Sequence, residues 1–323
     1  MADDSDNKSL LPIVETFDNF PYDAASEAEY YKLYLPGSSE PHGYLHPATV
    51  AKMPWDSHFQ IIHDPPRRVC ILAPSSGPSP SATVNRALAS VVDTCVSQRL
   101  FHVLDGQHSE PFAIPGAPYA VAVERFAAAL FGITSRGASL TAYTTASPGG
   151  AVQDLWIATR AARLYSFPSA LDTTVAGGVK AGATARDTLL AEAAEEASLP
   201  AGLVRARAVS AGVLTYVSAT GGAAGWPGEK GLAVPDVVYV YDCELAGDVV
   251  PVPGDGEVEG FAKMGVREVR ERLLRGEFKP DAAAVLIDFL MRHGVVTAEN
   301  EENFVEISMR LHRRLPFRIA PPA

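Results

Sequence analysis

The segment from Gly177 to Leu199 constrains the fold of this chain more than any other part of its sequence. A glycine-rich turn leads into an Ala/Leu-rich stretch that ends in three carboxylates, Glu192, Glu195 and Glu196. Residues three and four apart lie on one face of a helix, so Glu192 neighbours both of the other acids. Like charges at these spacings repel unless a cation lies among them. Because oxygen ligands suit Mg²⁺ or Mn²⁺, the segment predicts a helix that carries a divalent metal site.

The three acids also have a simpler interpretation, as the solvated face of an ordinary helix. Two features favour a site. The helix is nearly uncharged after Asp187, so the acids are concentrated rather than alternating with Lys or Arg. They also follow Gly177 and Gly178, and glycine lets the backbone approach a ligand closely. Thr184 and Asp187 have the spacing of a capping box, which predicts a helix over 184–197.

Composition and charge limit the class of protein. The chain has 323 residues, enough for about two domains of ~150 residues each. With 47% hydrophobic and 20% charged residues, it is expected to be an ordinary globular protein. A net charge of −11 argues against a nucleic-acid partner, because phosphate backbones bind basic surfaces. A small phosphorylated substrate remains compatible, since a bound metal supplies positive charge locally.

Cysteine usage and the ends of the chain point to no special compartment. Cys70, Cys95 and Cys243 stand far apart, which supports neither a zinc site nor a disulfide framework. The first residues are acidic and polar, unlike a signal or transit peptide. No apolar run approaches the ~18 residues that span a bilayer. The expectation is a soluble, cytoplasmic protein with no membrane partner.

The sequence pattern changes near residues 133–138, which predicts one domain over residues 1–135 and a second over residues 136–323. The polar, acidic stretch 1–30 is expected to lack order at its start. The first domain is expected to be a smaller α+β unit. Its predicted elements are a strand at 69–73, a loop at 74–81, a helix at 83–98 capped by Thr83, and a helix at 121–130.

The second domain mixes strands with helices without a regular β-α-β alternation. Its predicted strands cover 140–145, 155–159, 209–217 and 234–245, with a turn at 147–150 and a glycine-rich loop at 221–231. After the acidic helix, three amphipathic helices are predicted at 266–274, 281–293 and 301–311. This pattern predicts an α/β (α+β) fold with a mixed sheet.

The segment from Gly177 to Leu199 resembles the Nudix box. That box reads Gly, five residues, Glu, seven residues, Arg-Glu, an aliphatic, any residue, Glu-Glu, any residue, Gly and an aliphatic. Gly177 and Leu199 match its ends, and the three glutamates match its metal-binding acids. The chain departs from it at Ala183 in place of the first Glu, Ala191 in place of the Arg, and Ser198 in place of the last Gly. In the family that Arg helps to orient a catalytic glutamate.

Several separated segments are similar to the thiamine pyrophosphokinase-related Nudix proteins, which carry an additional N-terminal domain. The segments are 43–45, 124–133, 171–178, 194–200, 255–261, 278–281 and 286–294. The resemblance implies a Nudix α/β/α sandwich with a mixed sheet, preceded by the smaller domain. In fusions a kinase domain follows the Nudix domain, and this chain ends soon after its last predicted helix. The kinase is therefore expected to be absent.

The resemblance implies a metal-dependent diphosphatase that uses Mg²⁺ or Mn²⁺. The implied substrate is thiamine diphosphate or an oxidised form of it, cleaved to the monophosphate and phosphate. Oxidised guanine nucleotides, ADP-ribose and NADH are alternative substrates. A different class, a non-catalytic ligand-binding protein on a Nudix scaffold, is suggested by Ala183 and Ala191. Whether the N-terminal domain covers the active site or forms a homodimer stays open.

Further candidates lie outside the acidic helix. Glu257 and Glu259 are two apart in a predicted extended segment, so both side chains point to one face. They suit a further metal ligand and a general base, with an acidic surface loop as the alternative, and their order is open. Arg160 and Arg163 are suited to grip phosphates, although surface arginines are common.

The predicted site combines these residues. Its metal ligands are Glu192, Glu195, Glu196 and Glu257; its catalytic acids are Glu195, Glu196 and Glu259; its substrate-binding residues are Gly177, Gly178, Arg160 and Arg163. Tyr216 and Trp226 are placed either in the core or against a flat substrate ring.

Overall fold

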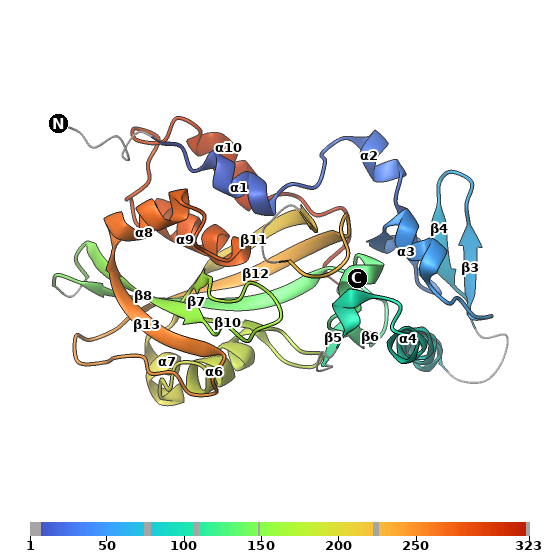
Figure 1. The fold of residues 1–323 in the computed structure, drawn as a ribbon, viewed down its shortest axis with the longest axis horizontal. Helices are drawn as coiled ribbons and strands as arrows, with labels where there is room; N and C mark the ends of the chain where they lie inside the picture. Colours follow the sequence, from blue (N-terminus) through green and yellow to red (C-terminus); the bar gives the residue numbers. More distant parts are fainter. Residues whose placement is uncertain (1–7, 74–78, 106–109, 148, 222–225, 321–323) are drawn as a thin grey trace.

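A seven-stranded mixed sheet forms the larger half of the molecule (Figure 1). The computed structural model describes residues 8–73, 79–105, 110–147, 149–221 and 226–320. The strands of this sheet are β7 (Ser135–Thr145), β8 (Val152–Arg160), β9 (Leu171–Asp172), β10 (Val175–Gly178), β11 (Val209–Ala219), β12 (Ala233–Glu244) and β13 (Val258–Gly265). Five of them follow the order β11-β12-β7-β8-β13, while β10 pairs with β7 and β9 with β8. The β12–β7 pair is parallel and the others are antiparallel.

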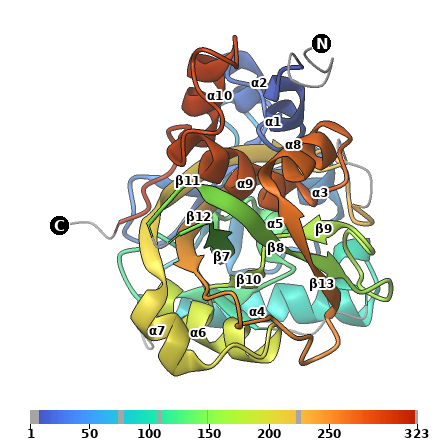
Figure 2. The same cartoon turned by 90° about the vertical axis from the view of Figure 1, so that its left-hand side faces the viewer.

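Helices cover both faces of this sheet (Figure 2). One layer is α6 (Ala185–Glu195) with α7 (Ala201–Arg207); the other is α1 (Leu11–Phe17), α8 (Val266–Leu274), α9 (Pro280–Arg292) and α10 (Phe304–Leu311). Within the second layer α9 is central, because every residue from Ala282 to Leu290 is buried. A mixed sheet between two helical layers confirms the predicted α/β class.

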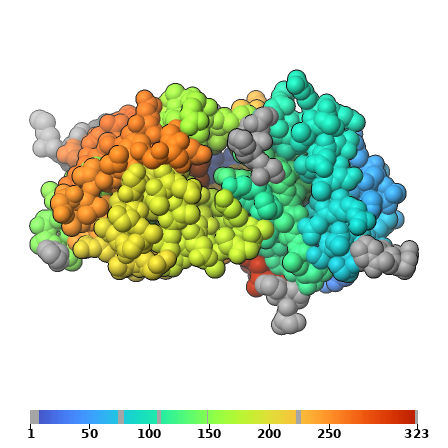
Figure 3. Space-filling model, turned by 90° about the horizontal axis from the view of Figure 1, so that it is seen from below, coloured from blue at the N-terminus to red at the C-terminus, as the bar shows by residue number. Residues whose placement is uncertain are grey.

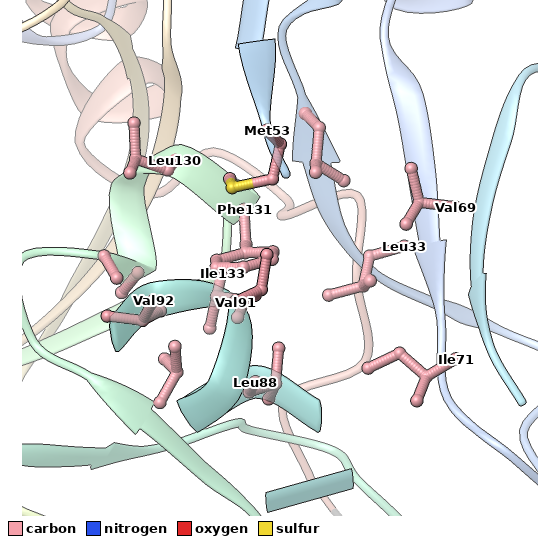
Figure 4. Packing of buried hydrophobic residues seen from close by; sticks show 14 of the residues in the cluster. Leu33, Met53, Val69, Ile71, Leu88, Val91, Val92, Leu130, Phe131 and Ile133 are labelled. Carbon is pink, nitrogen blue, oxygen red and sulfur yellow. The ribbon is translucent and has the colours of Figure 1, made fainter. Parts of the chain in front are cut away.

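The other half of the molecule is built on a four-stranded sheet of order β2-β1-β4-β3. Its elements are α2 (Ala24–Ala28), β1 (Tyr31–Tyr34), β2 (Pro41–Leu45), α3 (Pro47–Lys52), β3 (Phe59–Ile62), β4 (Arg68–Ile71), α4 (Pro80–Ser97), a 3-10 turn at His102–Leu104, the hairpin β5 (Pro111–Ala113) and β6 (Ala122–Glu124), and α5 (Ala128–Phe131). Side chains of α4, such as Leu88 and Val91, pack with Leu33 and Ile71 of the sheet and with Phe131 (Figure 4).

Helix α1 precedes the smaller sheet in the sequence but packs against the larger half. Leu10, Val14 and Phe17 are buried in the same cluster as the apolar face of α9. The Glu301 carboxylate accepts hydrogen bonds from the Ser9 hydroxyl at 2.6 Å and from the Leu10 N–H at 2.8 Å. Of the stretch expected to begin without order, residues 1–7 lie outside the described residues, and the part that follows contains α1 and α2. The domain boundary near 133–138 remains a prediction.

Most predicted strands and helices of the second half are confirmed. The strands predicted at 140–145, 155–159, 209–217 and 234–245 are β7, β8, β11 and β12. The helix at 266–274 has its predicted bounds, and α9 and α10 start one residue before and three residues after their predictions. In the first half, the strand at 69–73 corresponds to β4.

Two helix predictions in the first half need correction. The helix predicted from Thr83 begins at Pro80, because the Ser79 side chain caps it by accepting the Ala82 N–H at 3.3 Å. Thr83 lies buried inside the helix. The helix predicted at 121–130 is instead strand β6 followed by the short α5. A left-handed Gly132, with φ of 61°, ends α5 and supplied the correct stop signal.

Three predicted loops fall partly on residues that the structure does not describe. The loop at 74–81 includes residues 74–78, the turn at 147–150 includes residue 148, and the loop at 221–231 includes residues 222–225. Across the remaining, described part of the chain, no helix is long and apolar enough to cross a membrane.

Candidate active site

The acidic helix starts as the sequence predicts, but the glycines before it do not form a turn. The Thr184 hydroxyl accepts the Asp187 N–H, and the Asp187 carboxylate accepts the Thr184 N–H, both at 3.1 Å. This confirms the capping box. Gly177 and Gly178 are the last residues of strand β10, paired with Ala138 and Gly137 of β7. The turn comes later, at 180–183, where Gly182 adopts a φ of 84°.

The end of the acidic helix explains one departure from the box. Ser198, which replaces the last glycine, adopts a φ of 53°, in the left-handed region that glycine occupies most easily. This conformation returns the chain so that the Leu199 N–H donates to the Ala193 carbonyl at 2.9 Å. Ser198 therefore performs the geometric role of the missing glycine, at a local energetic penalty.

Two of the three helix carboxylates are withdrawn from water, and no Lys, Arg or His among the described residues forms an ion pair with them. Burial first, and then the nearby Glu195, raise the pKa of Glu192 to about 7. Burial first, and then the charge of Glu192, raise the pKa of Glu196 to about 9. One Glu196 oxygen accepts the Ala176 N–H at 3.2 Å, which partly opposes this rise. Glu195 is exposed on the same helix. The like-charge conflict that the sequence implies is therefore present.

Glu257 and Glu259 do not occupy equivalent places. Glu257 precedes β13, and its charge contributes to the raised pKa of both Glu192 and Glu196. The register of β13 against β8 shifts between Val258 and Gly260, which places Glu259 at an irregularity where strict alternation of side chains fails. Among the described residues, the charges that act most on Glu192 and Glu196 include Glu257 and not Glu259. Glu257, rather than Glu259, is therefore the acid whose charge acts on the helix carboxylates.

The donor set suits a hard divalent cation, although the side chains are not gathered around one point. Carboxylate oxygens are the preferred ligands of Mg²⁺, and their mutual repulsion makes a cation favourable here. Within the described residues, no three His, Cys, Asp or Glu side chains lie close enough together to hold a metal ion as placed. Binding would therefore require the glutamate side chains to rotate inward, which Glu195 and Glu257, both exposed, can do freely.

The two glycines make room for side chains of the protein itself. A Cβ at Gly177 would lie 2.3 Å from a carboxylate oxygen of Glu192, so any larger residue would displace that acid. A Cβ at Gly178 would lie 2.5 Å from the ring of Phe112 and 3.4 Å from the guanidinium carbon of Arg125. Both residues come from the first half of the chain. The glycine pair therefore packs the acid on one side and the β5–β6 hairpin on the other.

The two arginines predicted to bind phosphate are engaged within the protein. Arg160 donates to the Phe167 and Ser166 carbonyls and to the Asp172 carboxylate, at 3.0–3.1 Å. Arg163 donates to the Gly256 carbonyl at 2.9 Å and so holds the loop that leads to Glu257. These bonds give both arginines a structural role in the free protein. Their role toward a substrate stays a prediction.

A cavity of about 320 Å³ lies where the two halves meet, beside the glycine pair. Its walls include six aromatic side chains, which are Phe17, Phe112, Phe126, Phe167, Tyr216 and Trp226. Tyr216 also belongs to the buried core, and the Trp226 indole donates to the Glu229 carbonyl, so both have structural roles besides lining the cavity. Figure 3 shows this face of the molecule, where the α6–α7 layer adjoins the smaller half.

Charged groups of β12 and α9 reach the same cavity. Burial and the neighbouring Asp281 raise the pKa of Asp236 to about 7. Lys279 lies 2.8 Å from Asp281 and 3.9 Å from Asp172. Sequence reasoning missed Arg125, Asp236 and Lys279 as site residues. Two of them could have been noticed, because Arg125 and Lys279 lie in the segments 124–133 and 278–281, which are similar to the family.

Comparison with known proteins bears on this arrangement. No family model matches the chain. The chain is 37% identical over 216 residues to an uncharacterized protein of Saccharomyces cerevisiae, covering 66% of this chain and 63% of that protein. It is 32% identical to Nudix hydrolase 20, chloroplastic, of Arabidopsis thaliana, covering 61% of this chain and 50% of the relative. The chain thus spans between half and two thirds of the length of these relatives.

Solved structures overlap with the chain only weakly. The dihydroneopterin triphosphate pyrophosphohydrolase of E. coli gives a TM-score of 0.35 at 13% identity, covering 49% of this chain and 95% of that protein. The sequence relatives and the acidic helix carry more weight. The mixed sheet between two helical layers, with glutamates at the end of one helix, is consistent with the fold that the resemblance implies. The chain is therefore similar in sequence to two Nudix hydrolases of Arabidopsis thaliana, over about half of their length.

Proposed function

We propose that this protein is a metal-dependent hydrolase that cleaves a diphosphate linkage. The observation that carries the proposal is the pair of withdrawn carboxylates, Glu192 and Glu196, which repel each other at the end of the acidic helix. A structural role would pair such groups with Arg or Lys, because unpaired buried charges destabilise a fold. A divalent cation held by these carboxylates would relieve the repulsion instead.

The residues that would hold Mg²⁺ or Mn²⁺ are Glu192, Glu195, Glu196 and Glu257. When bound, the cation neutralises charge that develops on the diphosphate oxygens. Glu196 must lose a proton before it can ligate, since its pKa is about 9 without a cation. Glu257 is the acid outside the helix that we assign to activating water, with Glu259 as the alternative.

The substrate class we propose is a diphosphate that carries a flat heteroaromatic group. The aromatic cavity beside Gly178 supports this choice, because stacked rings bind planar ligands well. Thiamine diphosphate, or an oxidised form cleaved to the monophosphate and phosphate, is the first candidate from the resemblance. Oxidised guanine nucleotides, ADP-ribose and NADH are the alternatives. All are small molecules, and we propose no nucleic-acid or membrane partner.

A second candidate function is non-catalytic ligand binding on the same scaffold. It is favoured by Ala191 and Ala183, which stand in place of the arginine and of the first glutamate of the box. The named plant relatives are chloroplastic proteins. For this chain we propose a cytoplasmic location, which localisation of the tagged protein would check.

A substrate panel tests the proposal. Phosphate release from thiamine diphosphate, its oxidised forms, oxidised guanine nucleotides and ADP-ribose is measured with Mg²⁺, with Mn²⁺ and with chelator. We expect release that depends on metal and falls in Glu195→Gln and Glu196→Gln variants. Turnover that persists at the same rate in both variants contradicts the metal site. Saturable binding without turnover of any substrate favours the non-catalytic function.

A further inference from the structure

Arg125 differs from the other cations of the site because no described protein group accepts a hydrogen bond from its guanidinium. Within the described residues it makes no ion pair and no side-chain hydrogen bond. It lies over the rings of Phe112 and Phe126, with the guanidinium carbon 5.5 and 5.7 Å from their centres. Ring contacts of this kind leave the N–H donors at the guanidinium edge available. Arg160 and Arg163, by contrast, already donate to protein oxygens.

The position of Arg125 lies between the cavity and the acidic helix. Its side chain lines the cavity and would contact a Cβ at Gly178 at 3.4 Å. Its charge acts on Glu192, whose side chain lies against the adjacent Gly177. A ligand with a ring in the cavity and a diphosphate at the helix must therefore pass this guanidinium.

The hairpin that carries Arg125 is fixed to the larger half. The Lys180 ammonium lies 2.9 Å from the Glu110 carboxylate, and the Ala181 N–H donates to the Pro111 carbonyl at 2.8 Å. On the far side of Arg125, the Glu124 carboxylate accepts the N–H groups of residues 126 and 127 at 3.0 and 2.7 Å. These bonds hold the backbone on both sides of Arg125, so the guanidinium is presented in a preorganised place.

We propose that Arg125 is the anion-binding residue of the site, so that the smaller half contributes a group that binds the substrate's diphosphate. The proposal rests on the proposed function for the identity of the substrate. Guanidinium matches phosphate oxygens in charge and in geometry, with two parallel N–H donors. The box itself supplies no arginine, since position 191 is an alanine exposed on the helix. The smaller half thereby becomes part of the binding machinery rather than an appended domain.

The test measures binding rather than turnover, so that it can be separated from the proposed function. Isothermal titration of magnesium pyrophosphate into the full-length chain is compared for wild type, Arg125→Gln, Arg125→Lys and Arg86→Ala. Arg125→Gln removes the charge and leaves a shorter, neutral polar side chain, and Arg86 is an exposed arginine on α4 that serves as the control. We expect Arg125→Gln to weaken binding about 30-fold, Arg125→Lys to weaken it less, and Arg86→Ala to bind as wild type.

The outcomes divide cleanly. Wild-type affinity in Arg125→Gln, or no pyrophosphate binding by the wild type, overturns the role of Arg125. Equal weakening in Arg86→Ala also overturns it, because the effect would then be one of net charge. If pyrophosphate binds through Arg125 and no substrate of the panel is hydrolysed, the anion site stands and the proposed hydrolase fails. In an active enzyme, the loss in Arg125→Gln should fall mainly on KM rather than kcat.

Discussion

The larger half of the molecule contains two clusters of withdrawn charge that differ in how they are balanced. In one, Arg292 donates to both oxygens of Asp242 at 2.5 and 3.0 Å and to Asp288 at 2.7 Å, and His293 contacts Asp242 at 2.9 Å. Although burial raises the pKa of Asp242, bonds from His293 and Arg292 outweigh it, so that the net pKa is lowered. In the other cluster, Glu192 and Glu196 have no such partner and their pKa values rise. The comparison shows that contacts with Arg292 and His293 can lower the pKa of a buried carboxylate in the paired cluster, whereas burial beside other acids raises it in the unbalanced one.

The largest expected effect comes from the unbalanced cluster. Glu196→Gln removes one ligand charge and should lower metal-dependent hydrolysis about 10³-fold. It should not lower the free energy of unfolding of the metal-free protein, because the folded state holds Glu196 protonated and glutamine is a neutral side chain of the same shape. Phosphate-release kinetics and urea denaturation measure the two quantities. A destabilised but active variant would reverse the assignment of this cluster.

The paired cluster should respond in the opposite way. Asp242→Asn leaves the Arg292 guanidinium without its bidentate partner and should lower the free energy of unfolding by about 3 kcal/mol. The rate per folded molecule should stay close to that of the wild type. Urea denaturation in chelator provides the measurement. Unchanged stability would mean that this pairing contributes nothing net to the fold.

The free energy of unfolding should also depend on pH through the unbalanced cluster. The folded-state pKa of Glu196 is raised from 4.5 to about 9, so the folded state holds a proton that the unfolded state releases. Its contribution is fully present below about pH 4.5 and is lost as the pH rises toward about 9. At about 1.4 kcal/mol per pKa unit, we expect the metal-free protein to lose on the order of 6 kcal/mol over this range, and less in Glu196→Gln. Denaturation midpoints at several pH values report it, and a slope identical in the variant contradicts the prediction.

The smallest expected effect concerns the shape of the acidic helix rather than its charge. Ser198→Gly restores the glycine at a position with φ of 53° and should raise the free energy of unfolding by about 0.5–1 kcal/mol. Thermal unfolding in chelator detects a change of this size. A lower melting temperature would show that the Ser198 side chain contributes contacts that outweigh the strain.

The sequence was a good guide wherever local chemistry decides structure. The capping box at Thr184 and Asp187 fixed the start of the acidic helix, and the apolar pattern at 266–274 gave α8 its bounds. It was a poor guide where tertiary contacts decide. The sequence predicts a turn at Gly177 and Gly178, whereas both lie in a strand. They must be glycine because a Cβ would collide with Glu192 or Phe112, which are distant in the sequence. Likewise, Arg125 is 53 residues from Gly178 in sequence, and no periodicity connects them.

Helix α1 has a practical consequence for anyone who divides this chain. The apolar residues of α1 belong to the hydrophobic core under α9. A fragment that begins at residue 136 therefore lacks part of the core of the domain that it is meant to isolate. The smaller sheet lies between α1 and β7 in the chain, so it behaves as an insertion and not as a prefix. Its removal calls for excision with the flanking ends rejoined by a linker, leaving residues 8–17 in place.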